Sequence, residues 1–358
     1  MVNRKRLRYI FLTLLSLMMA LIGAGTVSAE DNGGFTYTVN FPENQLKKNI
    51  GSYHLMMKPG QEQTVTITMA NPGKEKSVIN VAVNSTKTNS NGVLENGDNN
   101  IKNDKSLKFD IKKIISAPKK VELKPGEKKD VEFKIKMPET SFEGFLSGGI
   151  QMIQAGQGED LKKSKGTQVI NEYAYVIGII LRENENDIKP ELKLNSVKAG
   201  QANYKNTIFV NYSNIKGNFV REMTTEVQIM EKGKDTVIYE KKQSKMRMGP
   251  NTAIDFPVDM NGEAMKAGNY TAKILVTADE GIREEWTKDF KITKEDADKF
   301  NERDVGLVQE KGLDWKLIAI IVVGFFVFVA IIFIIVHLLK KNKKKSKSKS
   351  SSKKRKKK

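Results

Sequence analysis

The chain has 358 residues and no cysteine, and its formal net charge at pH 7 is +19. A chain without cysteine cannot use disulfides, thiolate catalysis, Cys-ligated zinc or lipid attachment at an N-terminal cysteine. The net charge alone would suggest a nucleic-acid binder. However, 13 positive charges lie in the tail from Lys340 and 4 in the first eight residues, which leaves +2 for residues 9–339. We therefore expect no nucleic-acid partner.

The N-terminus has the pattern of a secretory signal. Basic residues precede an apolar stretch from Tyr9 to Met19, and the small residues Val27-Ser28-Ala29 form a cleavage site. We expect a signal peptide at 1–29. An uncleaved first membrane span is the alternative, which the polar residues Thr13 and Ser16 disfavour.

A first β module is predicted at 35–155. The segments 64–69, 79–83 and 130–136 each carry an apolar residue at every second position, which is typical of half-buried strands. Lys58-Pro59-Gly60 precedes the first of these segments, and Lys124-Pro125-Gly126 precedes the last, 66 positions later. Since Pro fixes φ and Gly accepts positive φ, both predict a type II turn. We interpret this repeated Lys-Pro-Gly segment as a turn that is used twice and not as a sign of a duplicated domain.

An insertion at 86–105 is rich in Asn and Gly. Amide-rich loops beside an aromatic ring suit the hydroxyl groups of glycans, and sandwich domains often bind through loops. The expected glycan contacts are Tyr53, Asn89, Asn91 and Gly92. Two alternatives stay open: a mobile loop without a ligand, and a calcium site at Asn89, Asn91, Glu95 and Asp98, although this spacing matches no EF-hand. The polar segment 156–165 is expected to be a linker or a hairpin tip.

A second β module is predicted at 166–293. Its first strand contains Tyr173, Tyr175, Ile177 and Ile179, and its second face is unusually apolar. We expect these four residues to bind a protein at an exposed sheet edge; burial of both tyrosines in a core is the alternative. Further strands are predicted at 192–197, 207–212, 225–230, 236–239, 254–258, 270–277 and 286–292.

The stretch Ala267-Gly268-Asn269-Tyr270 resembles the start of a late strand in immunoglobulin-like domains. In such domains a Tyr hydroxyl bonds back to the chain upstream. After this module, Thr293 and Asp296 predict a helix cap, and 294–314 is expected to form a juxtamembrane stalk.

A transmembrane helix is predicted at 315–339, followed by a basic cytoplasmic tail at 340–358. The run from Leu317 to Val336 is apolar and long enough to cross a bilayer as a helix, and Trp315 has the position of an interfacial aromatic. Lys340 and Lys341 begin the basic tail, which keeps the C-terminus in the cytosol. We expect a single-pass protein of the cell membrane whose N-terminal ectodomain faces the cell wall and the exterior.

The sequence contains few residues that could act in catalysis or bind a metal. His54 and His337 are the only histidines, and no nucleophile, zinc-protease or phosphate-loop motif occurs. Glu183 and Glu185 lie in a charged loop, which favours a solvated connection over a carboxylate pair. We expect no catalytic residue, no metal and no cofactor. A cell-wall glycosidase and a membrane sensor of wall state are the alternatives to a binding protein.

The whole layout resembles the WxL-interacting proteins of Gram-positive bacteria. The resemblance depends on the order of the modules and of these short segments: Phe41-Pro42-Glu43-Asn44-Gln45, Lys58-Pro59-Gly60-Gln61, Thr88-Asn89-Ser90-Asn91-Gly92, Lys136-Met137-Pro138 and Gly148-Gly149-Ile150. It implies two immunoglobulin-like antiparallel β-sandwiches in tandem. It also implies that the first domain binds peptidoglycan, and that the second binds WxL-domain surface proteins or host extracellular matrix proteins.

Overall fold

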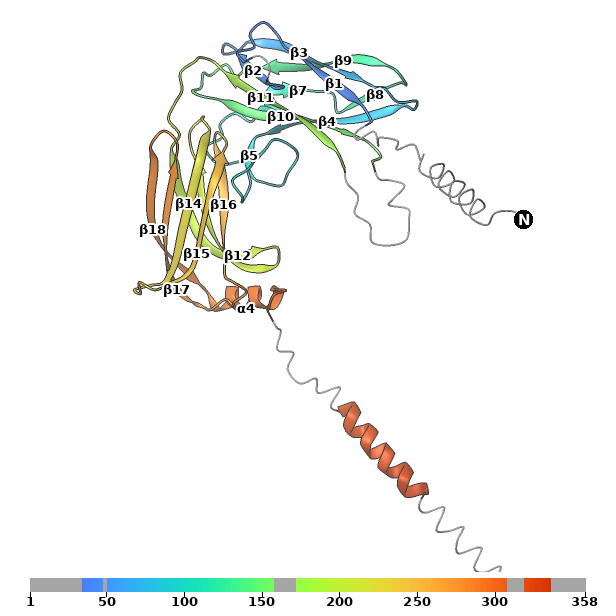
Figure 1. Ribbon diagram of the computed structural model, residues 1–358, viewed down its shortest axis with the longest axis vertical. Coiled ribbons are helices and arrows are strands. Elements are labelled where there is room, and N and C mark those ends of the chain that lie inside the picture. The colour runs from blue at the N-terminus through green and yellow to red at the C-terminus, as the bar shows by residue number, and fades with distance from the viewer. Residues whose placement is uncertain (1–33, 48–49, 158–171, 308–318, 336–358) are drawn as a thin grey trace, which may run out of the picture. The chain divides into compact units, whose positions relative to one another are not determined.

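The computed structural model describes residues 34–47, 50–157, 172–307 and 319–335 (Figure 1). Most of its regular structure is β-strand, which confirms the prediction of β-sheet modules before the C-terminal apolar run, and residues 319–335 are helical. Described residues up to Asn301 belong to one compact unit. The predicted signal peptide at 1–29 and basic tail at 340–358 lie outside the described residues.

The first sandwich consists of two sheets. One has the strand order β1 (Thr36–Asn40), β3 (Glu62–Ala70), β9 (Lys128–Lys136), β7 (Ile115–Ser116). The other has the order β2 (Tyr53–Met56), β11 (Ala174–Arg182), β10 (Leu146–Gln154), β4 (Ser77–Ser85), β8 (Lys120–Leu123). A short helix, α2 (Ile111–Ile114), and a two-stranded pair, β5 (Lys87–Thr88) with β6 (Leu94–Glu95), lie between β4 and β7. The predicted antiparallel pairing holds except between β2 and β11, which are parallel.

The repeated Pro-Gly turns start two strands that pair with each other. The backbone amide of Gln61 donates to Lys58 O, and that of Glu127 donates to Lys124 O, with Gly60 and Gly126 both at positive φ. The following strands β3 and β9 are antiparallel neighbours over their full length. The predicted turns are therefore confirmed.

Strand β11 belongs to the first sandwich, although it was predicted as the start of the second module. It forms a hairpin with β10, in which Ile150 lies opposite Ile177. Its apolar residues point into the first core, which buries Ile177, Ile179 and Leu181. In terms of sheet membership, the first sandwich thus extends to Arg182 and not to 155. The reason is that 155–173 joins two hydrogen-bonded strands, so the segment connects a hairpin and does not link domains.

The second sandwich also has two sheets. One has the order β12 (Leu192–Ala202), β13 (Lys205–Asn214), β16 (Thr252–Asp259), and the other β15 (Val237–Met248), β14 (Val220–Glu231), β17 (Gly268–Ala278), β18 (Ile282–Ile292). The Tyr270 hydroxyl donates to Lys266 O at 2.9 Å, which confirms the predicted bond back to the upstream chain. The strands end at α4 (Lys294–Arg303), whose predicted cap is confirmed because Asp296 N donates to Thr293 Oγ1 at 3.0 Å.

Helix α4 packs on the second sandwich. Ala297 is buried, Phe300 contacts the second core, and Gln201 Nε2 donates to Phe300 O at 2.8 Å. The first ten residues of the predicted stalk therefore belong to this module. The cap residues predicted where the helix begins, but they did not indicate the surface against which it packs.

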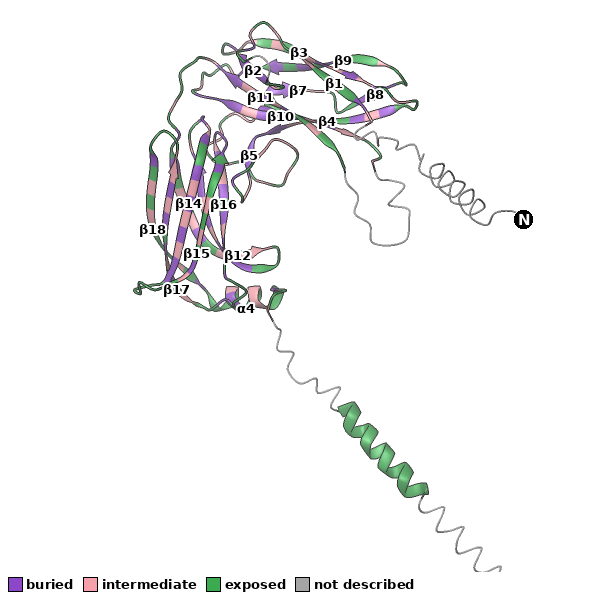
Figure 2. Cartoon of the chain, viewed as in Figure 1, coloured by how far each residue is buried: buried purple, intermediate pink, exposed green. Residues whose placement is uncertain are grey.

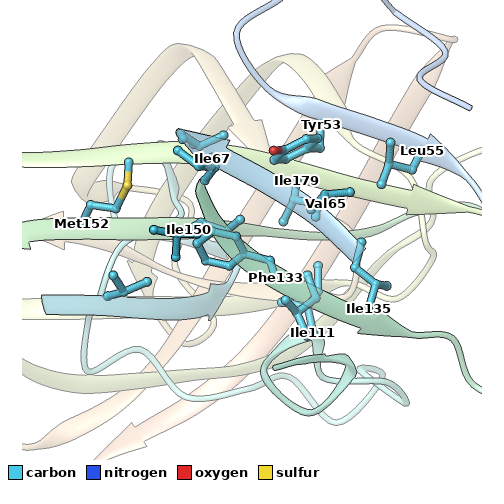
Figure 3. Close-up of a cluster of buried hydrophobic side chains, with 14 of the residues drawn as sticks. Tyr53, Leu55, Val65, Ile67, Ile111, Phe133, Ile135, Ile150, Met152 and Ile179 are labelled. Atoms are coloured by element: carbon cyan, nitrogen blue, oxygen red, sulfur yellow. The ribbon is translucent and has the colours of Figure 1, made fainter. Parts of the chain in front are cut away.

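Each sandwich has its own apolar core. Buried and exposed positions alternate along the strands (Figure 2), as expected when one face of a sheet packs against a second sheet. Figure 3 shows the first core, in which Phe133 of β9 and Ile150 of β10 belong to the two facing sheets. The second core is separate and contains Tyr212 and Phe256, both fully buried.

The predicted transmembrane segment is described only in its middle. Residues 319–335 are helical, and their large apolar side chains are exposed. Within the parts of the chain that the structure describes, no helix meets the combined length and apolarity needed to cross a bilayer. The anchor residues Trp315, Leu317, Val336, Lys340 and Lys341 lie outside these parts.

Candidate functional site

Tyr53 is a core residue and not a surface contact. Its side chain is fully buried, and its hydroxyl donates to Thr66 O at 2.6 Å (Figure 3). Burial raises the pKa of Tyr53 well above its ordinary value. The prediction that Tyr53 contacts a glycan is therefore wrong. The sequence could not show that the Tyr53 hydroxyl finds a hydrogen-bond acceptor inside the protein. Because it does, the whole side chain can be buried in the core.

The predicted protein-binding strand is likewise internal. Ile177 and Ile179 are buried, and Tyr175 packs edge-on against Phe35 and Tyr37. Strand β11 is flanked by β2 and β10, so it offers no free edge for strand addition. Only Tyr173 is exposed. The alternative of a core role therefore holds for Tyr175, and the edge-binding prediction fails for Ile177 and Ile179.

The Asn/Gly insertion packs against the second sandwich. Thr88 is buried, its Oγ1 lies 2.7 Å from Thr252 Oγ1, and it accepts a hydrogen bond from Gly249 N at 3.1 Å. Gly92 has a φ of 68°, and a Cβ there would lie 2.5 Å from Met246 Cβ. A side chain at Gly92 would therefore clash, and glycine is required by both conformation and close approach.

Asn91 and Asn89, the two loop asparagines predicted to contact a glycan, lie in different environments. Asn91 is exposed, and its backbone oxygen accepts from Gln243 Nε2 at 2.8 Å. The Asn89 side chain holds the turn itself: Oδ1 accepts from Asn91 N at 2.9 Å, and Nδ2 donates to Glu95 at 2.7 Å. These bonds occupy side-chain oxygens of Asn89 and Glu95, two of the four residues named above as the alternative calcium ligands. Among the described residues, no group of three or more His, Asp or Glu side chains is placed to hold a metal.

A groove of about 1330 Å³ lies between this loop and the outer face of sheet β12-β13-β16. Side-chain amides are the most numerous residues of its lining, together with four lysines, two aspartates and several apolar residues that include Phe209 and Pro257. The amide residues are Asn89, Asn91, Asn100, Asn103, Asn195, Asn203, Asn211 and Gln201. A wide polar groove rich in donors and acceptors suits a hydroxyl-bearing ligand better than an apolar one.

A chain of hydrogen bonds crosses the groove floor. Ser213 Oγ donates to Asp104 Oδ2 at 2.5 Å, which joins the loop to β13. Asn195 Nδ2 donates to Ser213 Oγ and to Asn211 Oδ1, both at 2.7 Å, and Asn211 Nδ2 donates to Asp255 Oδ1 at 2.8 Å. These side chains come from the loop and all three strands of the sheet. The network therefore orients the amides before any ligand binds.

Phe209 provides a flat apolar patch beside this network. It lies opposite Lys198 and Pro257 in the sheet and is half-buried. A Cβ on Gly200 would lie 2.9 Å from Phe209 Cε2, so the ring lies over the glycine of the neighbouring strand. An aromatic ring next to oriented amides is an arrangement that can stack on a sugar ring and bond its hydroxyls.

Asp104 remains ionised at neutral pH. Burial tends to raise its pKa, but hydrogen bonds from Ser106 and Ser213 outweigh burial, so the pKa lies below the ordinary value of 3.8. The carboxylate thus holds a fixed negative charge where the loop meets the second sandwich.

Sequence reasoning missed the sheet half of this groove. Phe209, Asn211 and Ser213 occupy every second position of β13, which is the signal of a common outward face. That periodicity could have identified the face, but it could not have shown that the Asn/Gly loop lies across it.

Glu183, in the charged loop considered for a carboxylate pair, has a structural role. It accepts hydrogen bonds from the Ser141 hydroxyl and from Phe142 N, so it holds a turn.

Comparison with protein families gave two matches. Residues 35–154 match the model described as WxL Interacting Protein, peptidoglycan binding domain, and residues 164–302 match WxL Interacting Protein, host binding domain. Both models describe binding domains. The second model includes the segment that forms β11 in the first sandwich.

Similar solved structures include three chaperones. They are the YadV chaperone (10% identity, 72% of this chain and 100% of that chain, TM-score 0.27), the Pseudomonas aeruginosa CupB2 chaperone (12%, 66% and 96%, 0.26) and the E. coli chaperone DraB (12%, 72% and 98%, 0.26). Identities and TM-scores this low carry no argument about function. Comparison with curated proteins gave no match.

Proposed function

This chain belongs to the WxL-interacting protein family, and from this membership we propose that it is a non-enzymatic surface protein that binds peptidoglycan and a second, protein partner. Both sandwiches are proposed to be immunoglobulin-like, a reading supported by the Tyr270 bond to Lys266. The partner of the second region is proposed to be a WxL-domain surface protein or a host extracellular matrix protein.

The groove is the proposed site for the glycan strands of peptidoglycan. The observation that carries this proposal is the oriented amide network beside the Phe209 ring. Sugar rings present apolar faces and many hydroxyls, so they need both a flat apolar surface and fixed donors and acceptors. The site then combines the loop of the first matched region with a sheet of the second.

Membrane anchoring is proposed from the sequence. The apolar run 317–336 and the basic tail from Lys340 support a single span with the folded modules outside. A protease added to intact cells should degrade the modules and leave a tail epitope protected. Protection of the modules would contradict this topology.

The test of the glycan site is co-sedimentation of the purified full chain with peptidoglycan sacculi. Phe209→Ala and Asn211→Ala should each weaken binding about tenfold, which corresponds to ~1.4 kcal/mol. Tyr204→Ala is the matched control, because Tyr204 is an exposed aromatic that does not line the groove. Unchanged binding in both groove variants would place the glycan elsewhere, and release of soluble sugar fragments would contradict a non-enzymatic role.

A further inference from the structure

Lys87 is a buried lysine at the start of the insertion loop. Its side chain reaches Asn103, because Nζ contacts Asn103 Oδ1 across the loop. Asn103 is itself exposed, but its amide group is held on both sides: Oδ1 faces Lys87, and Nδ2 donates to Asp110 Oδ2 at 2.9 Å. An amine, an amide carbon and a carboxylate are thus brought together from three places in the chain.

Asp110 is fixed independently of this contact. It caps helix α2 by accepting from Lys112 N at 3.0 Å, and the same oxygen accepts from Ser85 Oγ at 2.6 Å. Its second oxygen therefore stays directed at the Asn103 amide nitrogen. This is the position that a carboxylate needs in order to pass a proton from an attacking amine to a departing amide nitrogen.

Burial also favours the reactive form of the amine. Desolvation lowers the pKa of Lys87, although the nearby Asp110 charge opposes the shift. A neutral amine is a nucleophile, whereas an ammonium ion is not. Asp110 provides a nearby acceptor for the proton that must leave.

We propose that Lys87 and Asn103 form an intramolecular isopeptide bond with Asp110 as the proton carrier. The Lys87 ammonium gives a proton to the Asp110 carboxylate, and Nζ attacks Asn103 Cγ. The Nζ–Cγ bond forms and the Cγ–Nδ2 bond breaks. Asp110 returns its proton to Nδ2, and Nδ2 also accepts the second proton that Nζ loses in the tetrahedral state, so this nitrogen leaves as an ammonium ion. No oxidant or cofactor is needed.

Such a bond would fix the loop that forms one wall of the groove. It would join a residue of β5 to one that is 16 positions further along, and so close most of the insertion at 86–105 covalently. A chain without cysteine cannot make this closure with a disulfide. The proposal does not depend on which ligand the groove binds.

The test is peptide mass spectrometry of the full chain after trypsin digestion. We expect a branched peptide in which residues 77–102 are joined to residues 103–105, lighter than the two free peptides by one ammonia, about 17 Da. Cleavage after Lys87 should be lost. Separate peptides 77–87 and 88–102 would overturn the proposal. So would an ammonia loss found only in unbranched peptides, since Asn-Gly succinimides also lose ammonia.

Three variants and a control separate chemistry from packing. Lys87→Arg and Asn103→Ala should abolish the branched peptide. Asp110→Asn keeps an oxygen to cap α2 but cannot carry the proton, so formation of the branched peptide should slow on the order of 100-fold. Asn100→Ala, an exposed Asn of the same loop, should leave the branch intact. A branched peptide of undiminished yield and rate in Asp110→Asn would refute the role of Asp110, and one in Asn103→Ala would refute the bond itself.

Discussion

At the scale of single residues, the position of one glycine decides the shape of the groove floor. A Cβ on residue 200 would lie 2.9 Å from Phe209 Cε2, which is closer than an ordinary van der Waals contact. Any larger residue must displace the ring, because the strand pairing of β12 with β13 holds both backbones in place. The apolar part of the floor thus depends on a residue that contributes no side chain.

Gly200→Val is expected to weaken sedimentation with peptidoglycan about tenfold, or ~1.4 kcal/mol. The physical reason is that the valine side chain lifts Phe209 from the floor. Gly97→Ala is the control, since its nearest neighbour lies at 3.4 Å and the position accepts a Cβ. Full binding by Gly200→Val would show that the ring does not contribute.

Tyr53→Phe is expected to lower the free energy of unfolding by about 1 kcal/mol, because the buried Thr66 oxygen loses its donor. Urea denaturation measures this change. Binding to peptidoglycan should be unaltered, since Tyr53 has no exposed surface. A loss of binding at unchanged stability would restore the original prediction for this residue.

At the scale of elements, β11 determines where the first sandwich ends. It supplies Ile177, Ile179 and Leu181 to the core and fills the space between β2 and β10. Without it, β2 would lose its neighbour among the described strands of this sheet, and β10 would lose one of its two neighbours while keeping β4. The family-model boundary and the folding boundary therefore differ by one strand.

A fragment of residues 35–155 should fail to fold, whereas residues 35–187 should unfold cooperatively. The shorter fragment leaves an interior gap where three large apolar side chains belong, a loss of several times the roughly 2–5 kcal/mol of one buried Leu or Ile. Circular dichroism during a urea titration distinguishes the two. A cooperative transition in 35–155 would show that β11 is dispensable.

The strands themselves could be predicted, but their partners could not. Alternation identified the segment around 173–181 as a strand and gave its buried residues a common face. Period-2 patterning carries no information about which sheet receives the strand. The same limit applies to the groove, since Asn89 and Asn91 were found in a loop from composition, while Phe209 and Asn211 join them only through tertiary contacts.

At the scale of the whole molecule, the insertion loop links the two sandwiches within one compact unit. Thr88 meets Thr252, Gly92 meets Met246, and Asp104 meets Ser213. Thr88 and Asp104 make hydrogen bonds to the second sandwich, whereas Gly92 is packed closely against Met246. The loop thus serves as a connection between modules as well as a wall of the groove.

The contact through Asp104 should make the free energy of unfolding depend on pH. Because the folded-state pKa of Asp104 is lowered, its contribution is present above the ordinary pKa of 3.8 and is lost as pH falls through the lower folded value. Asp104→Asn should therefore unfold more easily than the unmodified chain at pH 7, by about 1 kcal/mol from the weakened hydrogen bonds. The difference should shrink at pH 3, as measured by urea denaturation. An equal difference at both values would rule out the carboxylate charge as the cause.

The parallel pairing of β2 with β11 has a mechanical consequence. The chain leaves the first sandwich at Arg182, the end of an interior strand that is hydrogen-bonded on both sides. Tension applied to the chain beyond this residue pulls β11 lengthwise, so it loads the bonds to β2 and β10 in shear, all at once. A terminal edge strand would instead peel away bond by bond. The first sandwich would therefore resist a pull on the chain beyond Arg182 through both neighbours of β11 together.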